Sequence, residues 1–478
     1  MLFLLSLAVL EGVVLENQTG KPLARAEVTL EVMQGQSGGP TRVLTGADGG
    51  FRFVSLSAGT YQVTARRKGF EIGRHGQARA EDAASPIVLA EDGHFSAVLR
   101  LRRPAGISGT VLDENGVGLP GVQVVAYTTG KRGRVAASTQ SDDRGRYRLW
   151  PLLAGRYAVS TGPHRLEDGT GLLPTWLGNT VERGQTRLVD AASEQDVSGA
   201  DLAPISGKLA GIRGIVGGEG LSRVLLRSEY GFRETNLKIG NSFEFQGLAP
   251  GDYELSVKGN GISAWKRVRL AGEDLYVEMK AGPSPKLRVH CRSEGGKAVP
   301  DGSASLFPEP RDPVEAMEVR IGCGETAALD AGEYRLRAVT ASNVYLESLS
   351  VRRSADSESE TFEVALDPGQ VSDVILTFGG KPASVEGVVK LGEREGAPGA
   401  PVFLRALDPD LYARSGGLRF SRADAEGRFR FDGLPPGNYE AVASFRFTRE
   451  REEEWSRGSG KAIRVQEGAK EAVDLELF

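Results

Sequence analysis

The sequence predicts an all-β protein, a tandem array of about five Ig-like or prealbumin-like β-sandwich modules. Three observations support this fold class. A short motif recurs five times along the chain, apolar and polar residues alternate through most of it, and turn-forming residues interrupt the alternation at short intervals. Short alternating strands that are separated roughly every 8–12 residues by turns are typical of a β-sandwich. Glycine makes up 63 of the 478 residues, and repeated tight turns account for such an excess.

The recurring motif consists of a small residue or proline, a glycine, a variable residue and a tyrosine. Each tyrosine opens a run in which every second residue is apolar, as in a strand that buries one face. Successive tyrosines are spaced by roughly one fifth of the chain, which indicates a repeat architecture. The five glycine and tyrosine pairs are Gly59 and Tyr61, Gly155 and Tyr157, Gly251 and Tyr253, Gly332 and Tyr334, and Gly437 and Tyr439.

The other elements of each repeat surround this motif in a fixed order. A repeat opens with a strand, an Asn/Asp-Gly turn and a second strand entered through proline, as in residues 109–126. A turn and a short strand follow, and Asp48, Asp143 and Asp424 are placed to accept hydrogen bonds from the backbone of those turns. Turn formation explains these acidic residues better than calcium binding, because calcium needs six or more oxygen ligands. The tyrosine strand and a last alternating strand complete the repeat.

These repeats divide the chain into predicted modules. The third copy has a partial motif, and the fourth is degenerate because it lacks the aromatic pair before its tyrosine. Residues 1–10 are either a truncated signal peptide or the first strand. The predicted boundaries are 1–10 for this segment, 11–104 for repeat 1, 105–206 for repeat 2, 207–283 for repeat 3, 284–382 for repeat 4 and 383–478 for repeat 5. We expect the tandem modules to form a rod.

The order Gly-x-Val, Gly-x-Pro, Asp-x-x-Gly-x-Phe and Gly-x-Tyr resembles the carboxypeptidase regulatory-like domain, of the transthyretin-like or carbohydrate-binding-like β-sandwich group. Repeats 1, 2 and 5 carry this pattern well, repeat 3 in part and repeat 4 weakly. The whole chain is similar to multi-repeat envelope proteins of acidobacteria. The resemblance implies a bacterial, non-catalytic accessory or spacer protein, because the motif residues are scaffold residues in this family. Members also occur beside TonB-dependent transporters and peptidases.

Several function classes find no support in the composition or the reactive side chains. The 59 basic and 63 acidic residues leave a net charge of −4, which provides no footprint for nucleic acid. None of the four histidines lies in a metal-ligand spacing, and the sequence has neither a nucleophile elbow nor a phosphate loop. No apolar stretch is long enough for a membrane-spanning helix. We therefore predict no enzyme activity, no metal, no cofactor and no integral membrane span.

Ligand binding is the main alternative to a spacer role. Aromatic rings combine an apolar face with a polar edge and stack on sugars, and Trp176 lies in a loop-like tail of repeat 2. We predict Trp176 as the candidate ligand contact, with glycans or envelope proteins as partners. Its alternative role is to pack the tail onto its own module. Trp150 follows a short strand and is predicted to cover an edge of the core.

The two cysteines, Cys291 and Cys323, both fall in repeat 4. A disulfide between them would contribute on the order of 3–4 kcal/mol by loop closure and would require export, whereas two reduced thiols are the alternative. We predict a secreted, periplasmic or outer-surface protein that acts as a structural spacer or adhesion-type module. The alternatives are a carbohydrate- or peptide-binding protein that uses variable loops, and an accessory fragment of a TonB-dependent transporter or peptidase system.

Overall fold

The structure, a computed structural model, confirms the all-β fold class. Its sheets gather in pairs, and each of five hydrophobic clusters lies between the sheets of one pair. We call each pair of sheets with its cluster a module and number the modules 1 to 5 along the chain. The described residues are 8–34, 39–77, 84–129, 134–259, 261–293, 304–310, 319–353, 357–390, 396–397, 399–424, 426–444 and 460–477.

Modules 1 and 2 occupy the first part of the chain. Module 1 contains β1 (Ala8–Glu16), β2 (Glu27–Gln34), β3 (Thr41–Leu44), β4 (Gly50–Leu56), β5 (Gly59–Arg66), β6 (Gly73–Arg74), β7 (Ile87–Leu89) and β8 (His94–Leu101). Module 2 contains β9 (Ala105–Thr110), β10 (Gln123–Thr128), β11 (Val135–Gln140), β12 (Arg146–Leu152), β13 (Gly155–Thr161), β14 (His164–Arg165), β15 (Gly171–Leu172), the 3-10 turn η1 (Arg183–Gln185), β16 (Val189–Ala191) and β17 (Asp196–Val197).

Modules 3 to 5 follow. Module 3 contains β18 (Ala210–Gly217), β19 (Leu221–Ser228), β20 (Gly231–Asn236), η2 (Ile239–Asn241), β21 (Ser242–Leu248), β22 (Gly251–Gly259), β23 (Ile262–Leu270), β24 (Leu275–Lys280) and β25 (Gly282–Pro283). Module 4 contains β26 (Lys286–Ser293), β27 (Ala304–Pro310), β28 (Ile321–Gly322), β29 (Thr326–Ala328), β30 (Gly332–Thr340), β31 (Tyr345–Arg352), β32 (Glu358–Glu360), β33 (Glu363–Leu366) and β34 (Val371–Gly379). Module 5 contains β35 (Ala383–Lys390), β36 (Pro401–Ala406), α1 (Pro409–Arg414), β37 (Arg419–Arg422), β38 (Arg428–Leu434), β39 (Gly437–Ala443), β40 (Lys461–Val465), β41 (Lys470–Ala472) and β42 (Leu475–Glu476).

Every module combines the same two kinds of sheet. In the first kind, the opening strand of the module lies between an antiparallel neighbour and a parallel strand from the end of the module. These sheets are β4-β1-β8, β12-β9-β17, β21-β18-β24, β29-β26-β34-β31-β32 and β38-β35-β41. The second sheets are β3-β2-β5-β6, β11-β10-β13-β16, β20-β19-β22-β23-β25, β28-β27-β30-β33 and β37-β36-β39-β40.

A glycine in the opening strand allows the parallel strand to approach closely. A Cβ atom on Gly12 would lie 2.0 Å from a backbone oxygen of β8, and one on Gly214 would lie 1.9 Å from a backbone oxygen of β24. These distances leave no room for any side chain. Gly109 and Gly387 meet a backbone oxygen in the same way in modules 2 and 5. The glycine at the front of the predicted repeat is therefore required by strand packing.

The motif tyrosines anchor the turns that precede their strands. The tyrosine strands β5, β13, β22, β30 and β39 all begin at the motif glycine. In all five modules the tyrosine hydroxyl donates a hydrogen bond of 2.7 or 2.8 Å to the backbone carbonyl four residues earlier. Burial raises the pKa of all five hydroxyls, that of Tyr253 to about 12, so each keeps the proton that this bond needs. The arrangement corresponds to the tyrosine corner of β-sandwich domains.

Replacing one of these tyrosines should destabilise one module. Tyr439 is fully buried and donates to the carbonyl of Pro435 at 2.8 Å. Tyr439→Phe should lower the opening free energy of module 5 by about 1–2 kcal/mol, because it leaves that carbonyl without its donor. Native-state hydrogen exchange of β39 measures the change within the full chain. Tyr276→Phe, on a ring that is 55% exposed, is the control and should have no effect; equal losses in both variants would contradict the prediction.

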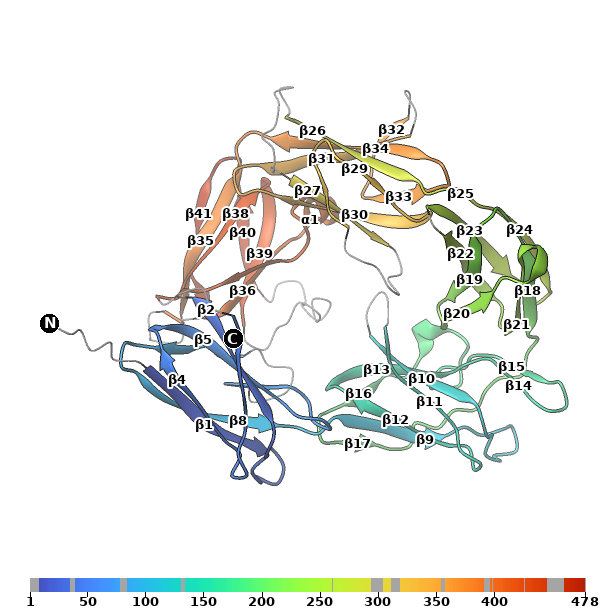
Figure 1. Cartoon of the computed structure of the whole chain (residues 1–478), viewed down its shortest axis with the longest axis horizontal. Coiled ribbons are helices and arrows are strands. Elements are labelled where there is room, and N and C mark those ends of the chain that lie inside the picture. Colours follow the sequence, from blue (N-terminus) through green and yellow to red (C-terminus); the bar gives the residue numbers. More distant parts are fainter. Residues whose placement is uncertain are drawn as a thin grey trace.

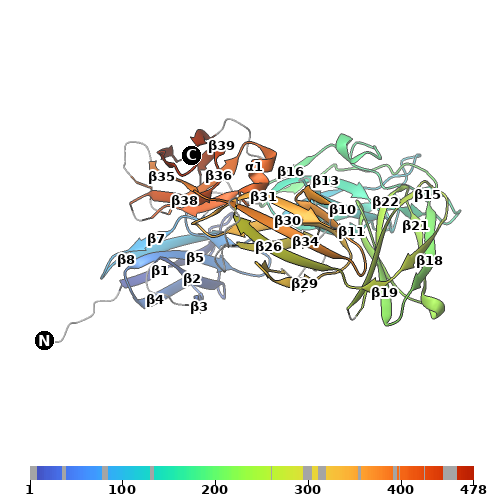
Figure 2. The same cartoon turned by 90° about the horizontal axis from the view of Figure 1, so that it is seen from above.

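The modules follow one another around a ring rather than along a rod (Figure 1). The first sheet of each module faces outward, and the second faces the centre. Module 5 lies against module 1 in both views (Figures 1 and 2). A Cβ atom on Gly399 of module 5 would lie 1.8 Å from Cγ of Pro86 in module 1. The rod expected from the tandem repeat is therefore wrong, because contacts at the junctions set angles that the repeat spacing does not encode.

The start of the described chain belongs to module 1. Ala8 and Leu10 are buried in its core, and β1 pairs with β4 and β8 from Ala8 and Val9 onward. The signal-peptide alternative also concerns residues 1–7, which lie outside the described residues. Within the part of the chain that the structure describes, no helix has the length and apolar character needed to cross a membrane.

Candidate functional site

The tail of module 2 folds back over the inward face of its second sheet. Strands β10 and β13 turn Val125, Tyr127 and Ala158 away from the main core of the module. Trp176 covers these side chains, and the tail is fastened by a β-bridge between Ser160 and Trp176. The side chain of Trp176 is 0% exposed.

Module 3 completes the surroundings of Trp176. Tyr230 of module 3 packs against the same cluster, and the Tyr127 hydroxyl donates a 3.2 Å hydrogen bond to the Tyr230 carbonyl. Burial raises the pKa of Tyr127 to about 12, so the hydroxyl stays protonated as a donor. The Arg183 guanidinium lies 5.5 Å from the centre of the Trp176 ring and 5.6 Å from that of Tyr127, within cation–π range. This cluster therefore joins modules 2 and 3.

The position of Trp176 does not fit the role of a sugar-stacking residue. Stacking requires an exposed ring face, and in this structure protein atoms cover Trp176 on all sides. The alternative role fits the geometry instead: the second sheet of module 2 presents an apolar outer face, and Trp176 packs the tail onto it. The indole Nε1 is buried and has no hydrogen-bond partner among the described residues.

Two substitutions of Trp176 should destabilise the junction of modules 2 and 3 to different extents. Trp176→Ala leaves a cavity and should destabilise the junction by about 3–5 kcal/mol. Trp176→Phe keeps most of the ring contact and removes the unpartnered N–H, so its cost should be less than half of that. Hydrogen exchange of β10 and β13 in the full chain measures both values. Equal costs would show that the indole N–H makes an interaction that the fold needs.

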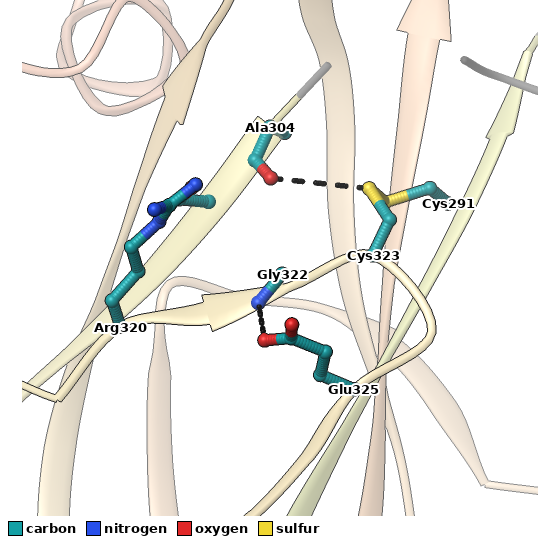
Figure 3. The surroundings of a disulfide bond; sticks show 7 residues. Cys291, Ala304, Arg320, Gly322, Cys323 and Glu325 are labelled. Carbon is teal, nitrogen blue, oxygen red and sulfur yellow. Dashed lines mark hydrogen bonds between the residues drawn. A yellow bond between two sulfur atoms is a disulfide. The ribbon is translucent and has the colours of Figure 1, made fainter. Parts of the chain in front are cut away.

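A disulfide joins Cys291 of β26 to Cys323, which follows β28 (Figure 3). The sulfur atoms are 2.00 Å apart and the Cα atoms 5.5 Å apart. Both residues pack against the core of module 4, and Cys323 lies opposite Cys291 where the antiparallel pairing of β29 with β26 continues toward β28. The bridge therefore fastens the crossover between the two sheets to the opening strand of the module. Beside it, Glu325 accepts a 2.6 Å hydrogen bond from the backbone N–H of Gly322 and holds the turn that carries Cys323.

Loss of the disulfide should weaken module 4 selectively. The double variant Cys291→Ser and Cys323→Ser should lower the opening free energy of this module by about 3–4 kcal/mol, as the loop length predicts. Hydrogen exchange of β26 and β34 reports on module 4, and that of β1 in module 1 is the internal control. An equal loss of protection in both modules would show that the bridge acts on the whole chain rather than on one sandwich.

The histidines do not assemble into a reactive site. His94 Nε2 lies 3.1 Å from Glu11, and His290 Nε2 lies 3.0 Å from Asp373, on the outer sheets of modules 1 and 4. His75 packs edge-on against a phenylalanine ring, and burial lowers its pKa. No three His, Cys, Asp or Glu side chains of the described residues come close enough together to hold a metal ion.

The acidic turn residues accept hydrogen bonds from the backbone. Asp424 Oδ1 accepts from two backbone N–H groups at 2.7 and 3.0 Å, and Asp48 Oδ1 accepts from one at 3.0 Å. In module 2 the acceptor is Asp142, which takes two bonds in the same way, and not the predicted Asp143. These oxygens are thus engaged in turn formation.

The other tryptophans differ in environment. Trp150 was predicted to cover a core edge, but it points away from the core and is 46% exposed, with the Arg148 guanidinium 5.8 Å from its ring centre. Trp265 donates from Nε1 to Asp367 at 3.2 Å across the junction of modules 3 and 4. Trp455 lies outside the described residues. Trp150 is therefore the most exposed of the three described tryptophans.

The residues that join the modules are not predictable from the repeat pattern. Between modules 3 and 4, the backbone N–H of Ala331 donates to the fully buried Ser263 Oγ at 3.0 Å, and Arg267 pairs with Glu333 at 2.7 Å. Between modules 1 and 2, Asn17 donates to Glu194 at 2.9 Å. In the sequence, these side chains resemble ordinary polar strand or turn residues. Their role becomes apparent only in the structure, because each one finds its partner in another module. One partial signal exists: Glu333 belongs to a motif turn.

Comparison with protein families agrees with this architecture in the first two modules. Residues 9–88 and 106–193 each match the carboxypeptidase regulatory-like domain. Both of the first two modules are thus similar to this regulatory-like domain. Both matched segments contain the opening strand, the turn aspartate and the tyrosine corner of their module. The comparison with curated proteins gave no match.

The solved structures that resemble parts of this chain include two pilins and the Bacillus anthracis TIE protein. The minor pilin of Streptococcus agalactiae is 14% identical, over 42% of this chain and 96% of its own, with a TM-score of 0.28. The Bacillus anthracis TIE protein is 12% identical, over 74% of this chain and 68% of its own, with a TM-score of 0.18. The shaft pilin SpaA of Lactobacillus rhamnosus GG is 11% identical, over 38% of this chain and 98% of its own, with a TM-score of 0.16. TM-scores this low carry no information about function.

Proposed function

We propose that the protein is a non-catalytic structural protein of the cell envelope or the cell exterior, which serves as a spacer or adhesion-type scaffold. The observation that carries this proposal is the common tyrosine corner of the five modules. The residues that recur from module to module form turns, strand contacts and cores, and the recurring pattern includes no nucleophile or acid–base pair. A scaffold that recurs without a recurring reactive site favours a structural role over a catalytic one.

The modules are proposed to fold as separate domains, with boundaries at 11–104, 105–206, 207–283, 284–382 and 383–478. In support, each hydrophobic cluster draws its residues from one of these segments, apart from Ala8 and Leu10 in module 1. Each unit also opens its first sheet with a new strand, beginning at Ala8, Ala105, Ala210, Lys286 and Ala383.

An oxidising location is part of the proposal. The disulfide in module 4 would persist in a periplasm or outside the cell, and it would be reduced in most cytosols. It fastens the opening strand of module 4, whose strand before the tyrosine turn, β29, carries no aromatic residue. The proposed partners are envelope proteins or glycans that contact the variable loops.

Glycan binding is the second candidate function, and the exposed ring of Trp150 with the adjacent Arg148 favours it. A glycan panel with the wild-type chain, Trp150→Ala and the control Tyr276→Ala separates the two roles, since both rings lie on outer sheets and are about half exposed. A spacer should show no saturable binding in any of the three. Saturable binding that drops at least tenfold in Trp150→Ala alone would overturn the pure spacer role in favour of glycan recognition.

A further inference from the structure

The ring is closed by a turn that recurs in several modules. In module 5 the backbone N–H of Gly399 donates to the carbonyl of Ala423 at 3.0 Å. Gly121 donates to Ser141 in module 2, and Arg25 donates to Thr45 in module 1, both also at 3.0 Å. The backbone is left-handed at all three positions: φ is 70° at Gly399, 70° at Gly121 and 56° at Arg25. The three turns are therefore structural equivalents.

The environment of the turn differs among these modules. Gly121 and Arg25 are exposed, and a Cβ atom on Gly121 would meet no atom within 4 Å. Gly399 is buried, and its Cβ atom would lie 1.8 Å from Cγ and 2.8 Å from Cδ of Pro86. Pro86 directly precedes β7, an edge strand on the second sheet of module 1. In module 5, a turn that faces solvent elsewhere thus docks on another module.

The four other junctions are held by the chain itself in addition to their contacts. Each joins consecutive modules, for example through Ser263 and Ala331 or through Arg414, which donates to the Glu347 carbonyl at 3.2 Å. The junction of modules 5 and 1 joins the two ends of the array, so no linker holds it. A contact within one chain needs little energy to stay closed, because the tether keeps the local concentration of its partner high. It is also the junction that can separate without unfolding a module or stretching a linker.

We propose that the Gly399 turn is a latch that closes the ring on Pro86, and that the array opens at this contact from a compact ring into an extended chain of modules. The ring stays shut because the turn lacks a side chain at the point of contact. Opening lengthens the protein without disturbing any of the five cores. The latch thereby sets the reach of the scaffold, and pulling on the two ends of the chain favours the open form.

Solution scattering distinguishes the two forms. Five modules of about 32 Å on a ring give a radius of gyration of about 30 Å, whereas the same modules in line give about 47 Å. The wild-type chain should give the ring value. Gly399→Asn should shift the radius toward the extended value, since asparagine tolerates positive φ but its Cβ atom cannot fit beside Pro86. Gly121→Asn has the same φ and open surroundings, so it is the matched control and should match the wild type.

Three results would overturn the latch. A wild-type radius near 47 Å would show that the ring is open without any substitution. An unchanged radius in Gly399→Asn would show that other contacts close the ring. A wild-type mass that doubles with concentration, in a manner that Gly399→Asn abolishes, would show that the turn binds a second copy instead. A second variant tests the same contact if Gly399→Asn alters the thermal unfolding of module 5. Pro86→Tyr blocks the contact from the side of module 1 and should give the same increase in the radius of gyration.

Discussion

In each of the five modules, the hydroxyl of one tyrosine donates a hydrogen bond to the backbone carbonyl four residues before it. The bond fixes the turn that enters the tyrosine strand, and this strand lies in the middle of the second sheet in every module. Its position determines where the neighbouring strands pair and which of their residues reach the core. Because the ring is buried while the hydroxyl stays hydrogen-bonded, the residue satisfies both the packing and the polar requirements of the sandwich.

The first sheet depends on a different constraint, the close parallel approach of the opening and final strands. Glycine permits this approach in four modules, at Gly12, Gly109, Gly214 and Gly387. Module 4 has no glycine in its opening strand β26, and there the sheet is wider and the Cys291–Cys323 disulfide links β26 to the turn between β28 and β29. The most divergent repeat thus keeps the common architecture with an additional covalent link at its opening strand.

The surfaces outside the cores decide how the modules are arranged. In module 2 the inward face of the second sheet is covered by Trp176, in module 3 the equivalent sheet meets module 4 through Ser263, and in module 5 a turn reaches module 1. These contacts differ from one junction to the next although the modules share one fold. A structural role is consistent with this division, since a common core provides the building unit and variable surfaces provide the shape.

The sequence by itself determined the fold class, the repeat, the five tyrosine strands and the pairing partner available to each cysteine. These features follow from local patterns, namely alternation, turn residues and a motif whose hydrogen bond spans only four residues. The tertiary structure alone decided that Trp176 is buried, that Trp150 is exposed and that the array curves into a ring. Burial of a loop residue and the angle between modules depend on surfaces far apart in the chain. Gly399 and Gly121 occupy the same local turn with the same φ, and only the presence of Pro86 distinguishes a contact from an open surface.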